Sequence, residues 1–193
     1  MRFVSLFRAG LVAAGLVAVS QASAIPLTMG GDYDNSSMSY TDRPIANPVP
    51  RESVSYDGAY APGTIIVSTR ERRLYLVLPD HQALKYGIGV GRPGFTWGGV
   101  LHVSMKREWP DWTPPAAMLR RRPDLPRHMK GGIDNPLGAR ALYLGSSEYR
   151  IHGSNEPDTI GQAVSSGCIR MTNDDVKDLY ERVRVGAKVI VQD

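Results

Sequence analysis

The chain has 193 residues, of which 42% are hydrophobic, 22% charged and 8% aromatic. This composition fits one folded domain with some additional sequence, because it is too apolar for a wholly disordered chain and too short for two full domains. The 23 basic and 19 acidic residues give a net charge of +4, too even a balance for a dedicated nucleic-acid-binding protein, and one cysteine excludes an intramolecular disulfide and four-cysteine metal sites.

Residues 1–24 have the layout of a secretory signal peptide. Arg2 and Arg8 precede an uncharged run over 9–19. The segment ends in Ala22-Ser23-Ala24, a typical cleavage sequence. A membrane anchor is the alternative, but the run is far shorter than the roughly 20 apolar residues that a helix needs to cross a bilayer. We expect export, cleavage after Ala24 and a soluble mature protein that is not an integral membrane protein.

Residues 25–61 predict a flexible N-terminal linker or arm. The segment is rich in Gly, Asp, Asn, Ser, Tyr and Pro, and it shows neither the period of a strand nor that of a helix. Its tyrosines leave open that the arm docks on the domain or on a partner.

The folded domain is predicted over residues 62–193. Short β-rich runs between polar turns predict strands at 64–68, 73–78, 84–90, 101–106, 142–144, 149–151 and 188–191. The run over 73–78 is apolar on both faces, so we expect it inside a sheet. No internal repeat or second domain is visible, and the sequence therefore predicts a mainly β fold.

Two short helices interrupt the strands. One is predicted over 114–121, because prolines suit its first turn and Pro123 follows its end. The other is predicted to begin at an Asn173 N-cap, with acidic residues in its first turn. Its buried face is expected to comprise Val176, Leu179, Tyr180 and Val183.

Cys168 is the candidate nucleophile. A buried cysteine that acts as a small hydrophobic residue is the simpler interpretation of a lone thiol. The preceding Ser165-Ser166-Gly167 favours a nucleophile, since a tight backbone there can present the sulfur and turn the amides around Gly167 and Cys168 towards an oxyanion. A thiol with a pKa of about 8.5 also needs a base or a nearby cation.

His152 is the candidate base. The other histidines, His81, His102 and His128, lie in a turn, a strand and a basic loop, where structural or solvated residues are expected. His152 instead ends a strand and opens a polar loop, a common place for catalytic groups. None of the four has a zinc-ligand spacing, so we expect no metal and no cofactor.

Residues 151–175 resemble the active-site signature of the L,D-transpeptidases, the YkuD-domain family. The matching motifs are Ile151-His152-Gly153-Ser154-Asn155, Ile160-Gly161, Ser165-Ser166-Gly167-Cys168-Ile169-Arg170-Met171 and Asn173-Asp174-Asp175. Upstream segments look like the framework of the same family, namely 63–67, 86–91, 109–115 and 131–138. The resemblance implies the L,D-transpeptidase catalytic fold, a β-sandwich or barrel-like mixed sheet with one or two short helices.

The resemblance also implies acyl transfer on peptidoglycan. Cys168 would attack a tetrapeptide stem with His152 as general base and acid, release the terminal D-amino acid, and pass the thioester to an amine on another stem or on an envelope protein. The Gly153 carbonyl would orient the imidazole. Ser166 stands where the family often has a second histidine, so its part on the acceptor side stays open.

Several residues have two interpretations. Arg170, Ser165 and Ser166 are candidate substrate-binding residues, and Arg170 can either hold a substrate carboxylate or pair with Asp174 or Asp175. Arginines 120–122 and 127 can attract the anionic substrate or form a solvated loop. The tryptophans at 97, 109 and 112 can line a groove or pack in the core.

Other functions also stay open. Water in place of the amine would make the protein an L,D-carboxypeptidase or a hydrolase. A non-catalytic peptidoglycan-binding protein is a third possibility, against which the Cys168 and His152 pair counts. A Gram-negative periplasm is the expected location, and nucleic acid is not an expected partner.

Overall fold

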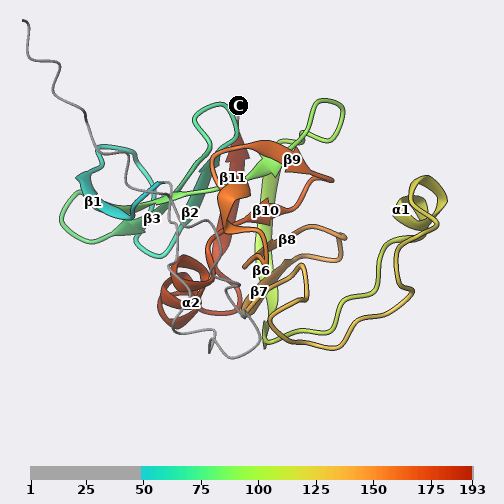
Figure 1. Ribbon diagram of the computed structural model, residues 1–193. Coiled ribbons are helices and arrows are strands. Elements are labelled where there is room, and N and C mark those ends of the chain that lie inside the picture. The colour runs from blue at the N-terminus through green and yellow to red at the C-terminus, as the bar shows by residue number, and fades with distance from the viewer. Residues whose placement is uncertain (1–48, 193) are drawn as a thin grey trace, which may run out of the picture. The chain divides into compact units, whose positions relative to one another are not determined.

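The computed structural model describes residues 49–192, which form a curled mixed sheet, a two-stranded sheet and short helices (Figure 1). The strands are β1 (Glu52–Ser55), β2 (Ile65–Ser68), β3 (Arg73–Leu78), β4 (Gln82–Gly87), β5 (Val90–Gly91), β6 (Gly99–Glu108), β7 (Arg140–Leu144), β8 (Arg150–His152), β9 (Ala163–Ser165), β10 (Ile169–Arg170) and β11 (Lys188–Gln192). The helices are α1 (Ala116–Arg121), the 3-10 turn η2 (Pro157–Thr159) and α2 (Asn173–Arg182). The predicted signal peptide lies outside the described residues.

The large sheet has nine strands in the order β1-β4-β3-β2-β11-β6-β7-β8-β10, and β5 pairs with β9 separately. Most neighbours are antiparallel, but β11 runs parallel to β2, and β10 runs parallel to β8. The prediction that residues 73–78 lie inside a sheet is confirmed, since β3 lies between β4 and β2. The predicted strand over 84–90 is divided between β4 and β5, and β9 and β10 were not predicted.

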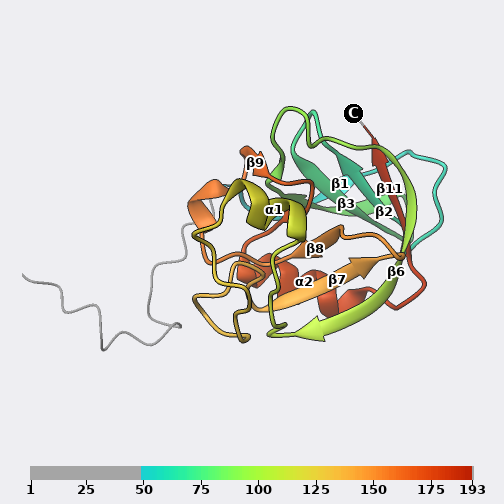
Figure 2. The same ribbon diagram turned by 90° about the vertical axis from the view of Figure 1, so that its right-hand side faces the viewer.

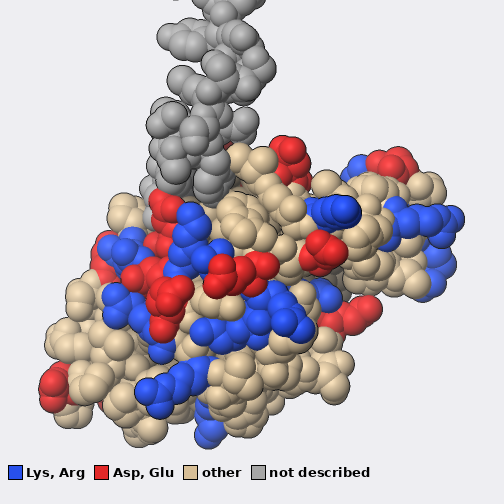
Figure 3. All heavy atoms as spheres, turned by 90° about the horizontal axis from the view of Figure 1, so that it is seen from below, with Lys and Arg blue, Asp and Glu red and all other residues tan. Residues whose placement is uncertain are grey.

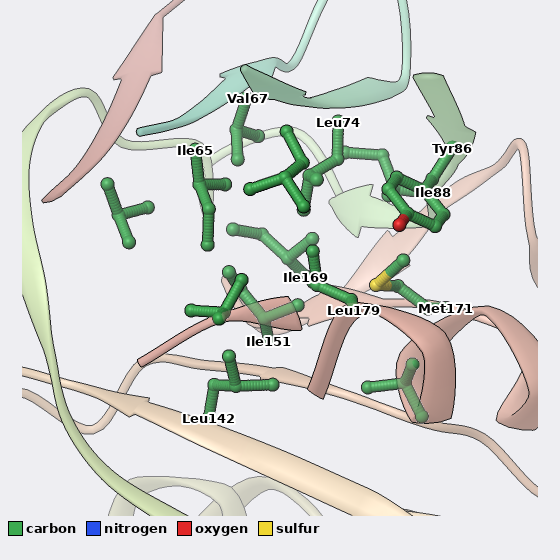
Figure 4. Close-up of a cluster of buried hydrophobic side chains, with 14 of the residues drawn as sticks. Ile65, Val67, Leu74, Tyr86, Ile88, Leu142, Ile151, Ile169, Met171 and Leu179 are labelled. Carbon is green, nitrogen blue, oxygen red and sulfur yellow. The ribbon is translucent and has the colours of Figure 1, made fainter. Parts of the chain in front are cut away.

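The core lies between the two halves of the curled sheet. Figure 4 shows side chains from β2, β3 and β4 meeting those from β7, β8, β10 and α2. The predicted buried face of α2 is confirmed for Val176, Leu179 and Val183, while Tyr180 is partly buried against the same cluster. No helix among residues 49–192 is long and apolar enough to span a membrane.

The end of the predicted linker belongs to the sheet. β1 pairs antiparallel with β4, from Glu52 opposite Lys85 to Ser55 opposite Gln82. Just before β1, Arg51 pairs with Asp178 of α2 at 3.0 Å. The prediction of a flexible arm up to residue 61 is therefore wrong for β1, because backbone pairing with an edge strand needs no apolar pattern in the added strand.

The helix α2 is capped at both ends. Thr172, not Asn173, is its N-cap, and its hydroxyl accepts a hydrogen bond from the Asp175 N–H at 3.2 Å. At the other end the Lys106 ammonium donates to the carbonyl oxygens of Tyr180 and Val183, where a cation also complements the helix dipole. The predicted N-cap was one residue late, which frees Asn173 for other contacts.

Tyr86 anchors the sheet to α2. Its ring is fully buried, and its hydroxyl donates to the Asp178 carboxylate at 2.6 Å. Burial, followed by the bond to Asp178, raises the pKa of Tyr86, so the hydroxyl stays a donor throughout the ordinary pH range.

Tyr86→Phe is expected to lower the free energy of unfolding by about 1–3 kcal/mol, because the partly buried Asp178 carboxylate loses a donor. Tyr75→Phe is the matched control, since the exposed Tyr75 hydroxyl bonds to Glu71 at 2.7 Å, and it is expected to change stability by less than about 0.5 kcal/mol. Urea unfolding of the three proteins measures both changes, and equal losses in the two variants would contradict the anchoring role of Tyr86.

Candidate active site

The short strands β8 and β10 bring the candidate site residues together. The strands are parallel, with Ile169 opposite Ile151, and both isoleucines are buried in the core, 3% and 0% exposed. Side chains alternate along a strand, so the residues on either side of each isoleucine face away from the core. Those residues are Arg150, His152, Cys168 and Arg170.

Cys168 and His152 are diagonal neighbours on this face. Arg170 lies directly opposite His152 in the register, and Cys168 precedes it by two residues. In sheets, diagonal positions are about 7–8 Å apart, a span that two side chains can bridge. The register therefore puts the predicted nucleophile and the predicted base on one face of two neighbouring strands, two positions apart.

His152 is held as a neutral imidazole with a defined tautomer. Its Nδ1 lies 2.6 Å from the Gly153 carbonyl oxygen, which can only accept a hydrogen bond, so Nδ1 carries the proton and Nε2 keeps a lone pair. The side chain is 4% exposed, and this burial lowers the pKa of His152 to about 3, with the charge of Arg170 acting in the same direction. The predicted contact between Gly153 and His152 is thus present in the structure.

Asn173 fixes the backbone that follows His152. Its Oδ1 accepts hydrogen bonds from the N–H groups of Ala139 at 2.8 Å and Ser154 at 3.2 Å. A Cβ on Gly153 or on Gly138 would lie 2.2 Å from this same oxygen, so neither position has room for a side chain. The glycine of the His-Gly motif is therefore required by the approach of a buried carboxamide.

The loop before Cys168 is tied together by Ser165. The Ser165 hydroxyl donates to the Cys168 carbonyl at 2.6 Å and accepts from the Gly167 N–H at 3.1 Å. Gly167 has a φ of 106°, and a Cβ there would lie 2.7 Å from the Tyr149 ring. The Gly167 N–H is thus engaged by Ser165 in this structure, and its role as an oxyanion donor stays a prediction. Ser165 links the two sides of the loop, and its contact with substrate stays a prediction.

Aromatic and basic side chains surround this loop. Trp97 donates from Nε1 to the Gly167 carbonyl at 2.7 Å and stacks on Tyr149 with the ring centroids 4.3 Å apart. Arg92 donates to the Ser166 hydroxyl at 3.2 Å. Sequence reasoning left the role of Trp97 open and did not identify Tyr149 or Arg92, because single residues distant in sequence carry no motif.

Burial and positive charge act on Cys168 in opposite directions. The thiol is partly buried, and this burial raises its pKa. The backbone N–H, the charge and the side chain of Arg150 lower the pKa, and the charge of Arg170 adds a smaller effect. The thiol itself donates to the Glu148 carbonyl oxygen, with Sγ 3.8 Å from that oxygen.

Arg170 pairs with a residue that was not predicted. Its Nη1 lies 3.0 Å from the Glu156 carboxylate, which is largely exposed. The predicted alternatives, Asp174 and Asp175, lie in the first turn of α2, and Asp175 pairs with Arg51 at 3.6 Å. The ion-pair interpretation thus had the wrong partner, since Glu156 is brought to Arg170 only by the loop after β8.

An arm over residues 109–139, between β6 and β7, carries α1 and projects on the side of β8 and β9 (Figures 1 and 2). The Arg121 guanidinium at the end of α1 lies 5.0 Å from the centroid of the Phe95 ring, and Arg92 lies 4.1 Å from the same ring. Basic side chains gather on this arm, at the right of Figure 3. Phe95 thus links the arm to the arginine that bonds Ser166.

Comparison with known proteins gives one family over most of the described residues. The L,D-transpeptidase catalytic domain family, YkuD, matches residues 62–191. The Escherichia coli K12 protein named probable L,D-transpeptidase ErfK/SrfK is 41% identical over 138 residues, which are 67% of this chain and 44% of that protein. The chain therefore spans less than half the length of this curated relative.

Solved structures agree on the fold. The catalytic domain of an Enterococcus faecium L,D-transpeptidase acylated by ertapenem is 20% identical with a TM-score of 0.54, over 70% of this chain and 100% of that one. A Brucella melitensis protein, named a probable carnitine operon oxidoreductase, is 44% identical with a TM-score of 0.50, over 74% of this chain and 93% of that one. The predicted L,D-transpeptidase fold, a mainly β curled sheet, is confirmed.

The buried His152 is expected to make the protein less stable in acid. Its folded pKa is below the unfolded value of about 6.5, so its contribution is complete above pH 6.5 and is lost as the pH falls towards about 3. His152→Asn keeps an N–H donor for Gly153 but cannot titrate. Between pH 7 and 5, urea unfolding should show a loss about 1–2 kcal/mol larger in the parent than in the variant. Parallel losses would contradict the depressed pKa.

Gly153→Ala is expected to destabilise the fold by about 1–3 kcal/mol, because its methyl group would overlap the Asn173 carboxamide oxygen. Gly132→Ala is the control, since a Cβ at that position meets no atom within 4 Å. Both free energies of unfolding come from urea titrations at pH 7. The close approach of Asn173 would be refuted by a Gly153→Ala protein as stable as the control.

Proposed function

The chain belongs to the L,D-transpeptidase catalytic domain family, and we propose that it acts on peptidoglycan stem peptides through a thioester on Cys168. One observation carries the proposal. The pairing of β8 with β10 places Cys168 on the same face as a neutral His152, whose Nδ1–H is bonded to the Gly153 carbonyl. A nucleophile, a base and an orienting acceptor are the three parts that such a reaction needs.

Acylation begins with proton transfer from the Cys168 thiol to Nε2 of His152. The sulfur forms a bond to the stem-peptide carbonyl carbon on the L-centre of the diamino acid. The C–N bond to the terminal D-amino acid then breaks, and the His152 imidazolium gives its proton to the leaving amine. The products of this step are a thioester on Cys168 and the free D-amino acid.

Deacylation uses an amine as the second substrate. His152 takes a proton from the amine as the amine nitrogen attacks the thioester carbon. The C–S bond then breaks, and the His152 imidazolium gives its proton to the leaving sulfur, which restores the thiol. We propose an amine on another stem or on an envelope protein as the acceptor. Water in the same place would give the carboxypeptidase or hydrolase reaction.

We assign the oxyanion contact to the N–H of Cys168, because the Gly167 N–H is bonded to Ser165. For the substrate carboxylates we keep Arg170, whose charge lies on the same face two residues beyond the nucleophile. Ser166 is the remaining substrate-binding candidate, through the Arg92 contact that holds it in the loop. The basic side chains on the arm over residues 109–139 support attraction of an anionic substrate.

We propose export to the envelope as the setting of this reaction. Residues 1–24 carry the charged start, uncharged run and small-residue end of a signal peptide. Peptidoglycan lies outside the cytoplasmic membrane, so the proposed substrate and the proposed export agree. A Gram-negative periplasm is the proposed compartment.

Cys168→Ala and Cys168→Ser are expected to lower transpeptidation at least about a thousandfold while the domain stays folded, because no other thiol can form the thioester. The measurement is intact-protein mass spectrometry after incubation with a diaminopimelate-containing tetrapeptide. The parent should gain the tripeptide acyl group, without the final D-alanine, and Cys168→Ala should gain nothing. Ertapenem is a second probe, expected to acylate only the parent.

The acceptor is tested in the same assay. Addition of a second stem peptide should release the adduct as a cross-linked dimer. Release of free tripeptide alone would assign the hydrolase reaction instead. The covalent mechanism would be contradicted if the parent stays unmodified under turnover conditions while circular dichroism shows an intact fold.

A further inference from the structure

Arg150 lies beside Cys168 but belongs to none of the roles described above. Cys168 and Arg150 directly precede the paired isoleucines Ile169 and Ile151, so they lie at the same end of the two parallel strands and on the same face. On its other side Arg150 is opposite Tyr143 of β7, and its guanidinium carbon lies 5.0 Å from the centroid of that ring. The guanidinium thus packs against an aromatic ring on the β7 side.

The thiol and the guanidinium converge on one carbonyl oxygen. Arg150 donates from Nη1 to the Glu148 carbonyl at 2.8 Å, and the Cys168 thiol donates to the same oxygen over 3.8 Å. The Nε of Arg150 is buried and donates to no group in the described part of the chain. A buried N–H on a cation without an acceptor is unfavourable, so this side chain, which shares an acceptor with the thiol, has unused hydrogen-bonding capacity.

Deprotonation changes the sulfur of Cys168 from a hydrogen-bond donor into an acceptor. The thiol donates to the Glu148 carbonyl, whereas a thiolate can only accept and would be repelled by that oxygen. When the proton moves from Sγ to Nε2 of His152, the Arg150 guanidinium offers N–H donors and a positive charge to the new anion. The same side chain that shares an acceptor with the thiol therefore becomes the partner of the thiolate.

We propose that Arg150 is a positioning residue that stabilises the thiolate of Cys168 and holds it in line for attack. The inference rests on the proposed function in taking Cys168 as the nucleophile. Other charged and titratable groups on the elements around Cys168 are His152 on β8 and Arg170 with its partner Glu156. Arg92 contacts Ser166, Tyr149 lies against Gly167, and Tyr143 packs on Arg150. Among the two arginines on this face, Arg170 is paired with a carboxylate, whereas Arg150 has no carboxylate partner among the ion pairs of residues 49–192.

The test measures how fast the Cys168 thiol is alkylated at different pH values. Because Cys168 is the only cysteine, the rate of carboxamidomethylation by iodoacetamide between pH 6 and 10.5 follows its thiolate fraction without interference. Arg150→Gln and Arg150→Met remove the charge, and each is expected to raise the apparent thiol pKa by about one unit, which slows alkylation roughly tenfold at pH 7.5. Arg150→Lys is expected to recover most of the parent rate.

Arg107→Gln is the matched control, since Arg107 is exposed on β6, and it should leave the profile unchanged. Circular dichroism and urea unfolding establish which variants fold, and either neutral variant suffices for the comparison. A folded neutral variant with the parent profile would overturn the proposal and leave Arg150 a structural role only. Since iodoacetamide is not a peptide, this result is independent of whether the chain acts on stem peptides.

Discussion

The active face depends on the burial of two isoleucines, Ile151 and Ile169. β8 and β10 are only three and two residues long, and their parallel pairing is fixed because both isoleucines enter the core with α2. A slip of one residue would turn His152 or Cys168 into that core and bring an isoleucine to the surface. Two hydrogen bonds between Gly89 and Arg170 hold the other side of β10. The positions of the candidate site residues are thus set by apolar side chains that are buried in the core.

Asn173 fixes the backbone next to His152, the candidate base. One carboxamide oxygen joins the start of α2 to the backbone on both sides of the site, at Ala139 and Ser154. That contact leaves no room for side chains at Gly138 and Gly153, and it fixes the carbonyl that accepts from His152. A peptide oxygen does not titrate at accessible pH, whereas a carboxylate in its place would. The imidazole tautomer is therefore held by backbone geometry wherever His152 is neutral, above its pKa of about 3.

The sequence predicted the strongly patterned parts of the fold and missed those that depend on distant contacts. β3 and the buried face of α2 follow from apolar periodicity, and both were found. β1 was missed because pairing at an edge needs no apolar face, and β10 because two residues carry no period. At the site, motif residues such as His152 could be named, but their neighbours could not. Trp97 contacts the loop before the nucleophile across 70 residues of sequence, and no local pattern encodes such a contact.

The electrostatics of the site favour a neutral resting pair. Burial lowers the pKa of His152 to about 3 and raises the pKa of Cys168. In the resting state the shared proton therefore stays on the Cys168 sulfur and the imidazole is neutral. Both shifts disfavour a resting thiolate and imidazolium. The positive charges of Arg150 and Arg170 stabilise the thiolate and disfavour the imidazolium. In the proposed mechanism the ion pair would therefore form only during attack on the carbonyl. An imidazolium with so low a pKa is a strong acid, suited to protonating the leaving amine, and a protonated resting thiol resists oxidation.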